Sequence, residues 1–219
     1  MSESLIQLTP VTRPDSAAAA SRANLERRAR RLAAAGNLWH VVEFAVALAA
    51  GIAAGSLALI AFGADSLIEV LAGTVIIWRF SGGRRSSAIS ERRAQQVIAA
   101  SFFLLAAYVL VEGARALLTG SQAQASWLGI ALAAVAAVTM PLLARAKRKV
   151  GHELHSSAAV SEAAQNQICA YLSVALLVGL LLNAVWGLWW ADPAAALVIA
   201  AVAVKEGRDS WRGDSCDCC

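Results

Sequence analysis

The sequence predicts an all-α protein that crosses a lipid bilayer with six helices. Two observations carry this prediction: the length of the apolar segments and the distribution of positive charge between them. Of the 219 residues, 58% are hydrophobic and only 16% are charged, whereas a soluble domain has about 25% charged residues. The apolar residues are collected in blocks, and a helix of roughly 20 such residues crosses the hydrocarbon core.

Five apolar blocks meet or approach that length, and the sixth is shorter. Ala and Leu dominate the blocks, and none of them alternates polar with apolar residues, so strands are not expected. In chain order the blocks are 38–54, 57–78, 94–118, 127–144, 168–190 and 191–204.

Positive charge alternates between the connections of these blocks. Of the 19 Lys and Arg residues, all except Arg115 lie before the first block, between the second and third, between the fourth and fifth, or after the sixth. Basic residues stay on the cytoplasmic side of a membrane. This pattern predicts two cytoplasmic termini and supports the short sixth span. The positive residues form no single patch, so no nucleic-acid partner is expected.

The ends of the chain differ from its centre. Residues 1–36 are polar and rich in Arg and Ala, which predicts a cytoplasmic arm that is partly disordered or forms an amphipathic helix near 24–35. The first apolar run starts too late and is too long for a signal peptide. Residues 37–207 form the predicted six-helix membrane domain, and 208–219 form a cysteine-rich cytoplasmic tail.

The second block contains two acidic residues, Asp65 and Glu69. Their i, i+4 spacing places both on one helix face. An acid near the centre of a membrane helix costs about 2.5–3.5 kcal/mol on insertion scales, and two neighbouring carboxylates repel each other unless a proton or a cation lies between them. The pair therefore predicts a divalent metal site. The alternative is a structural network of protonated acids.

The fifth span offers a matching face with Glu162, Gln165 and Cys169. A thiolate and an amide oxygen are plausible metal ligands, and Cys favours softer ions such as zinc, cadmium or cuprous copper. Gln165 and Cys169 are therefore predicted to complete the metal shell, with Glu162 as an accessory ligand. The alternatives are a Cys that packs as a small core residue and a Glu162 at the cytoplasmic mouth.

Three further groups are candidates for accessory metal contacts. Glu43 follows His40 by three residues and either lines the same cavity or pairs with Arg79. His152 and His155 precede the fifth span, where they either pass ions to a pathway or are solvated interfacial residues.

The tail ends with three thiols in four residues, which could capture a thiophilic metal with help from other ligands. These are Cys216, Cys218 and Cys219. An inert tail is one alternative. A prenylated Cys216 is another, although Asp217 fits that motif poorly.

These residues resemble the cation diffusion facilitator family. The segment Asp65-Ser-Leu-Ile-Glu69 is similar to the acidic pair on the second span of that family, with Glu where Asp is usual. Residues 161–169 are similar to the motif of its fifth span, with Gln165 and Cys169 where His and Asp usually stand. The resemblance covers most of the membrane region and is nearest to a small, divergent bacterial branch.

The resemblance implies a six-helix bundle in a bacterial inner membrane, a homodimer, and a divalent cation, zinc first, as the substrate rather than a resident cofactor. Two departures are visible. The cytoplasmic domain that usually follows the sixth span is replaced by the cysteine tail. The fifth span has no His, so the returning proton would bind to the carboxylates of Asp65 and Glu69 or to the Cys169 thiol.

The sequence therefore predicts a secondary transporter that exports a divalent heavy-metal cation by alternating access and in exchange for protons. The alternative is a membrane protein that binds or senses metal, or regulates a partner, without transporting it. An enzyme is not expected, because no nucleophile with a nearby base, phosphate-binding loop or catalytic zinc motif is visible.

Overall fold

The part of the chain that the structure describes folds into six α-helices. The structure is a computed structural model that describes residues 16–81 and 88–212, and it has no strand within these ranges. The helices are α1 (Ser16–Ala54), α2 (Leu57–Ser81), α3 (Ala88–Thr119), α4 (Trp127–Glu153), α5 (Ser157–Trp186) and α6 (Ala191–Arg212). The predicted all-α fold is confirmed.

Five of the helices are long and apolar enough to cross a membrane, counting only the residues described. Large apolar side chains also cover the outside of the bundle: on α3, for example, Leu104, Val111 and Leu118 are all exposed. A face of this kind is stable against lipid tails but not against water. The chain is therefore a multi-pass membrane protein.

Helix α6 is the short one, as its composition predicts. Its apolar part ends at Val204 and is followed by Lys205 and Glu206, so α6 is not among the five helices that qualify by length and hydropathy. It nevertheless lies within the bundle and packs against α2, α3 and α5.

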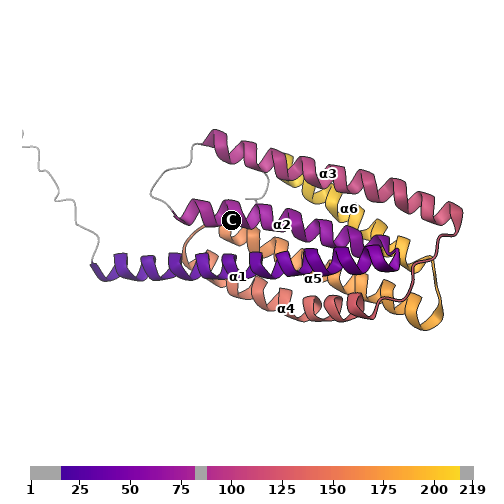
Figure 1. Ribbon diagram of the computed structural model, residues 1–219. Coiled ribbons are helices and arrows are strands. Elements are labelled where there is room, and N and C mark those ends of the chain that lie inside the picture. The colour runs from indigo at the N-terminus through magenta and orange to yellow at the C-terminus, as the bar shows by residue number, and fades with distance from the viewer. Residues whose placement is uncertain (1–15, 82–87, 213–219) are drawn as a thin grey trace, which may run out of the picture.

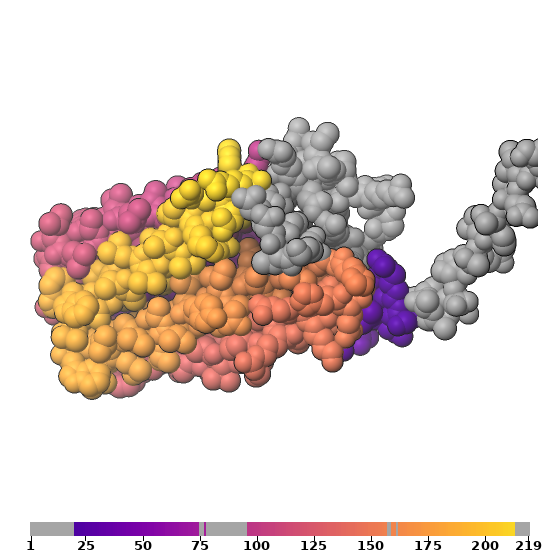
Figure 2. All heavy atoms as spheres, turned by 180° about the vertical axis from the view of Figure 1, so that it is seen from behind, coloured from indigo at the N-terminus to yellow at the C-terminus, as the bar shows by residue number. Residues whose placement is uncertain are grey.

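Successive helices run in opposite directions, and α2 occupies the centre of the bundle (Figure 1). Helix α2 contacts α1, α3, α5 and α6, while α4 packs along both α1 and α5. From the opposite side, α6 lies between α3 and α5 (Figure 2). The interior between α1, α2, α4 and α5 is therefore lined in part by α2 and α5, the helices that carry the polar residues of the second and fifth spans.

The two ends of the bundle differ. We use the name basic end for the one where α1 begins, α4 ends, α5 begins and α6 ends, because exposed Arg145, Arg148, Lys149 and Arg208 lie there. The opposite end, the tight-turn end, has Gly55 and Gly187 in its connections, each with a φ of 65°. This left-handed backbone favours glycine and permits abrupt reversals.

Helix α1 continues without a break through position 36, where the arm was expected to meet the first span. Ala29 of this helix is buried in a small cluster with Val150 and Leu154 of the α4 end, and Leu25 and Leu32 pack against the cluster. The 24–35 segment therefore packs one apolar face on the basic end of α4.

A buried carboxylate fixes the start of α2 at the tight-turn end. Asp192, near the start of α6, accepts hydrogen bonds from the backbone N–H groups of Leu57 at 2.9 Å and Ala58 at 3.4 Å, and from the Ser56 hydroxyl. These N–H groups would otherwise have no partner at a helix start. Asp192 thus ties α6 to α2.

Candidate metal centre

The acidic pair of α2 lies inside the bundle and not on its lipid-facing surface. Asp65 is 6% exposed and Glu69 is 8% exposed. Glu69 faces α1 and α5, where it meets other ionisable side chains. Asp65 lies one helical turn nearer the tight-turn end, and no described residue forms a hydrogen bond or ion pair with its carboxylate.

Four side chains from three helices converge on one point in the interior. His40 and Glu43 come from α1, Glu69 from α2 and Cys169 from α5, and one potential ligand atom of each lies within 4.8 Å of the others. We call these residues the four-ligand cluster. His40 Nδ1 is 2.8 Å from Glu43 Oε2 and 3.0 Å from Glu69 Oε2.

The protonation of His40 follows from its neighbours. Asn166 Oδ1 accepts a hydrogen bond from the Lys147 ammonium, which turns the amide Nδ2 toward His40 Nε2, 3.0 Å away. Because an amide N–H can only donate, Nε2 is the acceptor and the ring proton is on Nδ1. That single proton faces both Glu43 and Glu69.

The cluster has more acceptors than donors. Glu43 Oε1 is buried without a hydrogen-bond partner in the described part of the chain, and Glu69 Oε2, 3.0 Å from His40 Nδ1, forms no well-aligned hydrogen bond there. A buried polar atom without a partner costs about 1–3 kcal/mol, and more when it is charged. A divalent cation would satisfy both oxygens. One imidazole, two carboxylates and one thiol are a ligand set that suits zinc and similar ions.

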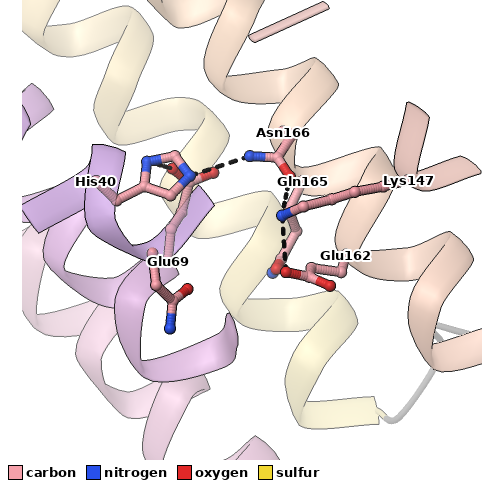
Figure 3. Close-up of a pocket in the computed structure, with 7 residues that line it drawn as sticks. His40, Glu69, Lys147, Glu162, Gln165 and Asn166 are labelled. Atoms are coloured by element: carbon pink, nitrogen blue, oxygen red, sulfur yellow. Dashed lines mark hydrogen bonds and ion pairs between the residues drawn. The ribbon is translucent and has the colours of Figure 1, made fainter. Parts of the chain in front are cut away.

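A small pocket adjoins the cluster on the side of the basic end. Its cavity volume is about 10 Å³, enough for about one water molecule. Figure 3 shows its polar lining, which is formed by His40, Glu69, Lys147, Glu162, Gln165 and Asn166. Asn37 also contributes.

The structure brings together only some of the residues that the sequence predicts as metal ligands. Glu69 and Cys169 lie together in the four-ligand cluster, and Glu43 joins them. Gln165 lines the pocket rather than the cluster, and Asp65 lies one turn deeper.

The other accessory candidates lie at the basic end or outside the described residues. Glu162 is buried, lines the pocket and accepts a hydrogen bond from Lys147 Nζ at 2.7 Å. His152, in the last turn of α4, and His155, in the connection between α4 and α5, are both exposed. The side chain of Arg79 and all of Cys216, Cys218 and Cys219 lie outside the described residues.

Sequence reasoning missed the roles of three residues. His40 was noted only as a neighbour of Glu43, although a His and a Glu at i, i+3 in an apolar span already indicate a shared site. Lys147 is hidden in the basic run 145–149, where a solvated face is the ordinary interpretation. Asn166 is one turn after Glu162, a spacing that could have indicated one polar face from Glu162 to Cys169.

Comparison with known proteins identifies the membrane domain. No curated protein matches the sequence. The family model described as the cation efflux transmembrane domain matches residues 90–212, which is more than half of the chain and includes α4, α5, α6 and nearly all of α3. The match begins after α1 and α2, so it contains Cys169 but not the other residues of the four-ligand cluster. The chain belongs to the cation efflux, or cation diffusion facilitator, family of membrane cation transporters.

Proposed function

We propose that this chain is a secondary transporter that exports a divalent heavy-metal cation, zinc first, in exchange for protons. The observation that carries the proposal is the four-ligand cluster, in which, among the residues described, Glu43 Oε1 is buried without a partner and Glu69 Oε2 contacts the His40 ring proton that Glu43 also accepts. In a structural network of acids, these oxygens would be expected to have hydrogen-bond partners. In an ion site, they are free to bind the ion.

The ligand set combines residues from three helices. Glu69 and Cys169 occupy the positions that the family resemblance assigns to metal ligands. His40 and Glu43 of α1 supply the other two ligands. They replace Asp65 and Gln165, which the sequence predicts as ligands. Because these ligands are distributed over α1, α2 and α5, a relative movement of the helices would open or close the shell, as alternating access requires.

Proton exchange follows from the same chemistry. Metal binding requires a deprotonated thiol, carboxylates and an imidazole with a free ring nitrogen. An ion that binds at His40 Nδ1 displaces the proton now held there. When the ion leaves, protons can neutralise Glu43 and Glu69 and avoid two like charges in a low-dielectric interior.

The orientation follows from the basic end. Basic residues are retained on the cytoplasmic side, so we place this end and both termini in the cytoplasm of a bacterial cell, with α6 as the sixth span. We retain the homodimer that the family resemblance implies. Ions would then enter the pocket from the cytoplasm and leave through the tight-turn end.

Zinc flux into proteoliposomes tests the proposal. Glu69→Gln and His40→Ala each remove one ligand, and we expect zinc uptake to fall at least about 10-fold, because even changes in the outer shell of a metal site cost about 10–100-fold. The control is Glu112→Gln, which neutralises a half-exposed acid of α3 that is paired with Arg115 outside the cluster.

Two outcomes would reject the proposal. Wild-type uptake in the folded Glu69→Gln protein would show that the cluster is not the transport site. Tight zinc binding by the wild-type chain without any uptake would favour the alternative, a membrane protein that senses or stores metal.

A further inference from the structure

A lysine ammonium lies inside the bundle and lines the pocket. Lys147 is 5% exposed, although it belongs to a run of basic residues whose neighbours Arg148 and Lys149 are exposed. Its Nζ donates hydrogen bonds to Glu162 Oε1 and Asn166 Oδ1, both at 2.7 Å. Burying an ion pair is costly because both charges are removed from water. A long side chain this close to a helix end could instead reach the surface.

The ammonium is connected to the four-ligand cluster by one amide. Asn166 accepts from Lys147 through Oδ1 and donates to His40 Nε2 through Nδ2. The polar contacts therefore run from Glu162 through Lys147 and Asn166 to His40, as Figure 3 shows. Glu162 precedes Cys169 on α5 by about two turns, or roughly 10 Å along the helix, so this chain extends from the basic end to the cluster.

The Lys147 ammonium also fills space between the basic end and the four-ligand cluster. A Cβ atom added to Gly36 of α1 would lie 2.8 Å from Lys147 Nζ, so α1 closes over the ammonium only because position 36 has no side chain. The remaining cavity of about 10 Å³ is too small for an ion with its water shell. An ion that moves through this pocket to the four-ligand cluster would take the place of Lys147 Nζ.

We propose that Glu162, Gln165 and Asn166 form a second divalent-cation site, which we call the vestibule site, and that Lys147 occupies it as a built-in cation until a metal ion displaces it. The proposal rests on the proposed transport function. A carboxylate and two amide oxygens are suitable ligands for a divalent ion. Exchange of one cation for another keeps Glu162 paired, so the buried carboxylate is never left without a positive partner.

Zinc binding at equilibrium tests the vestibule site. The full chain, with Cys216, Cys218 and Cys219 replaced by Ser so that the tail does not bind metal, is dialysed against Zn²⁺ and the bound metal per chain is counted. Lys147→Met removes the internal cation but nearly keeps the side-chain volume, and we expect one more bound ion per chain than in the parent. Adding Glu162→Gln to Lys147→Met should remove the additional ion.

Two matched variants control for charge. Lys149→Met makes the same change at an exposed position on α4 and should keep the parent count. Lys147→Arg retains a cation at the vestibule site and should also keep it.

Gly36→Ala gives a second route if Lys147→Met fails to fold. The added methyl group would push the flexible end of Lys147 away from Glu162 and Asn166, so the additional ion should bind to this variant also, at a lower zinc concentration than to the parent. An unchanged count in whichever of these variants folds, or an additional ion that survives Glu162→Gln, overturns the vestibule site.

The readout is a difference between variants, so it is separate from transport. If the parent takes up no zinc but Lys147→Met still gains an ion, the proposed function fails while the vestibule site stands. If transport is intact and no variant gains an ion, the vestibule site is rejected while the proposed function stands.

Discussion

At the scale of single residues, the interior of this protein contains two kinds of buried carboxylate. Asp192 is satisfied by the Ser56 hydroxyl and by two backbone N–H groups of α2. In the described ranges, Glu43 retains an oxygen without a partner, and Glu69 shares the single ring proton of His40 with Glu43. The first kind has the properties of a structural cap, and the second has those of an ion site.

Asp192→Ala should therefore affect stability. The substitution removes the cap of α2 and leaves a buried hydroxyl without its acceptor, so we expect a loss of about 1–3 kcal/mol in the free energy of unfolding. Thermal unfolding in detergent, followed by circular dichroism, measures this loss. Asp209→Ala, at a half-exposed position of the same helix, is the control. Equal melting temperatures for the two variants would contradict a capping role.

The sequence could identify part of the metal centre but not its partners. Asp65 and Glu69 are conspicuous because acids are costly in an apolar span, and Cys169 follows from its place on the face that begins at Glu162. His40 and Asn166 give only a spacing signal on their own helices, and the contact between them depends on which helices touch. Helix periodicity gives the face of each helix, but not the rotation and height at which α1 meets α2.

At the scale of elements, close helix packing depends on small residues. Gly179 of α5 faces α6 so closely that an added Cβ would lie 2.8 Å from Ala195 Cβ and 3.1 Å from the backbone oxygen of Ala191. Backbone atoms cannot move away as a flexible side chain can. Small residues at such contacts allow two membrane helices to approach and to pack by van der Waals contact.

Gly179→Leu should force α5 and α6 apart. Overpacking of a tight contact costs about 1–3 kcal/mol, so we expect a lower melting temperature in detergent. Because Cys169 lies on the same helix, we also expect weaker zinc binding. Val178→Leu adds bulk at an exposed neighbour and should change neither quantity. A Gly179→Leu protein as stable as the wild type would show that α5 and α6 need not touch here.

The existence of the helices was more predictable than their limits. Apolar length indicates where a chain crosses a membrane, and charge alternation supported α6, a helix too short to qualify by hydropathy alone. The continuity of α1 through residue 36 was not predictable, because Gly36 reads as an ordinary helix breaker. The structure gives it a different role: its missing side chain makes room for the Lys147 ammonium.

At the scale of the whole molecule, the polar groups form an ordered series along the bundle axis. From the basic end, the series runs from Lys147 and Glu162 to the four-ligand cluster and then to Asp65, one turn deeper. On the proposed transport route, each step would bring the ion near another acidic oxygen. Most of the remaining buried side chains are apolar, which strengthens the interaction of an ion with these groups.

This arrangement makes a prediction about protons that concerns the molecule as a whole. If His40, Glu43 and Glu69 exchange protons for the ion, zinc that enters the lumen of a proteoliposome must be accompanied by protons that leave it. A pH-sensitive dye trapped in the lumen should therefore report a rise in pH that follows zinc uptake. Glu69→Gln should abolish both signals, and Glu112→Gln should preserve both. Zinc uptake at constant luminal pH would mean that the cluster exchanges its ion without protons, and that the positive charge of the ion must be balanced by another movement of charge.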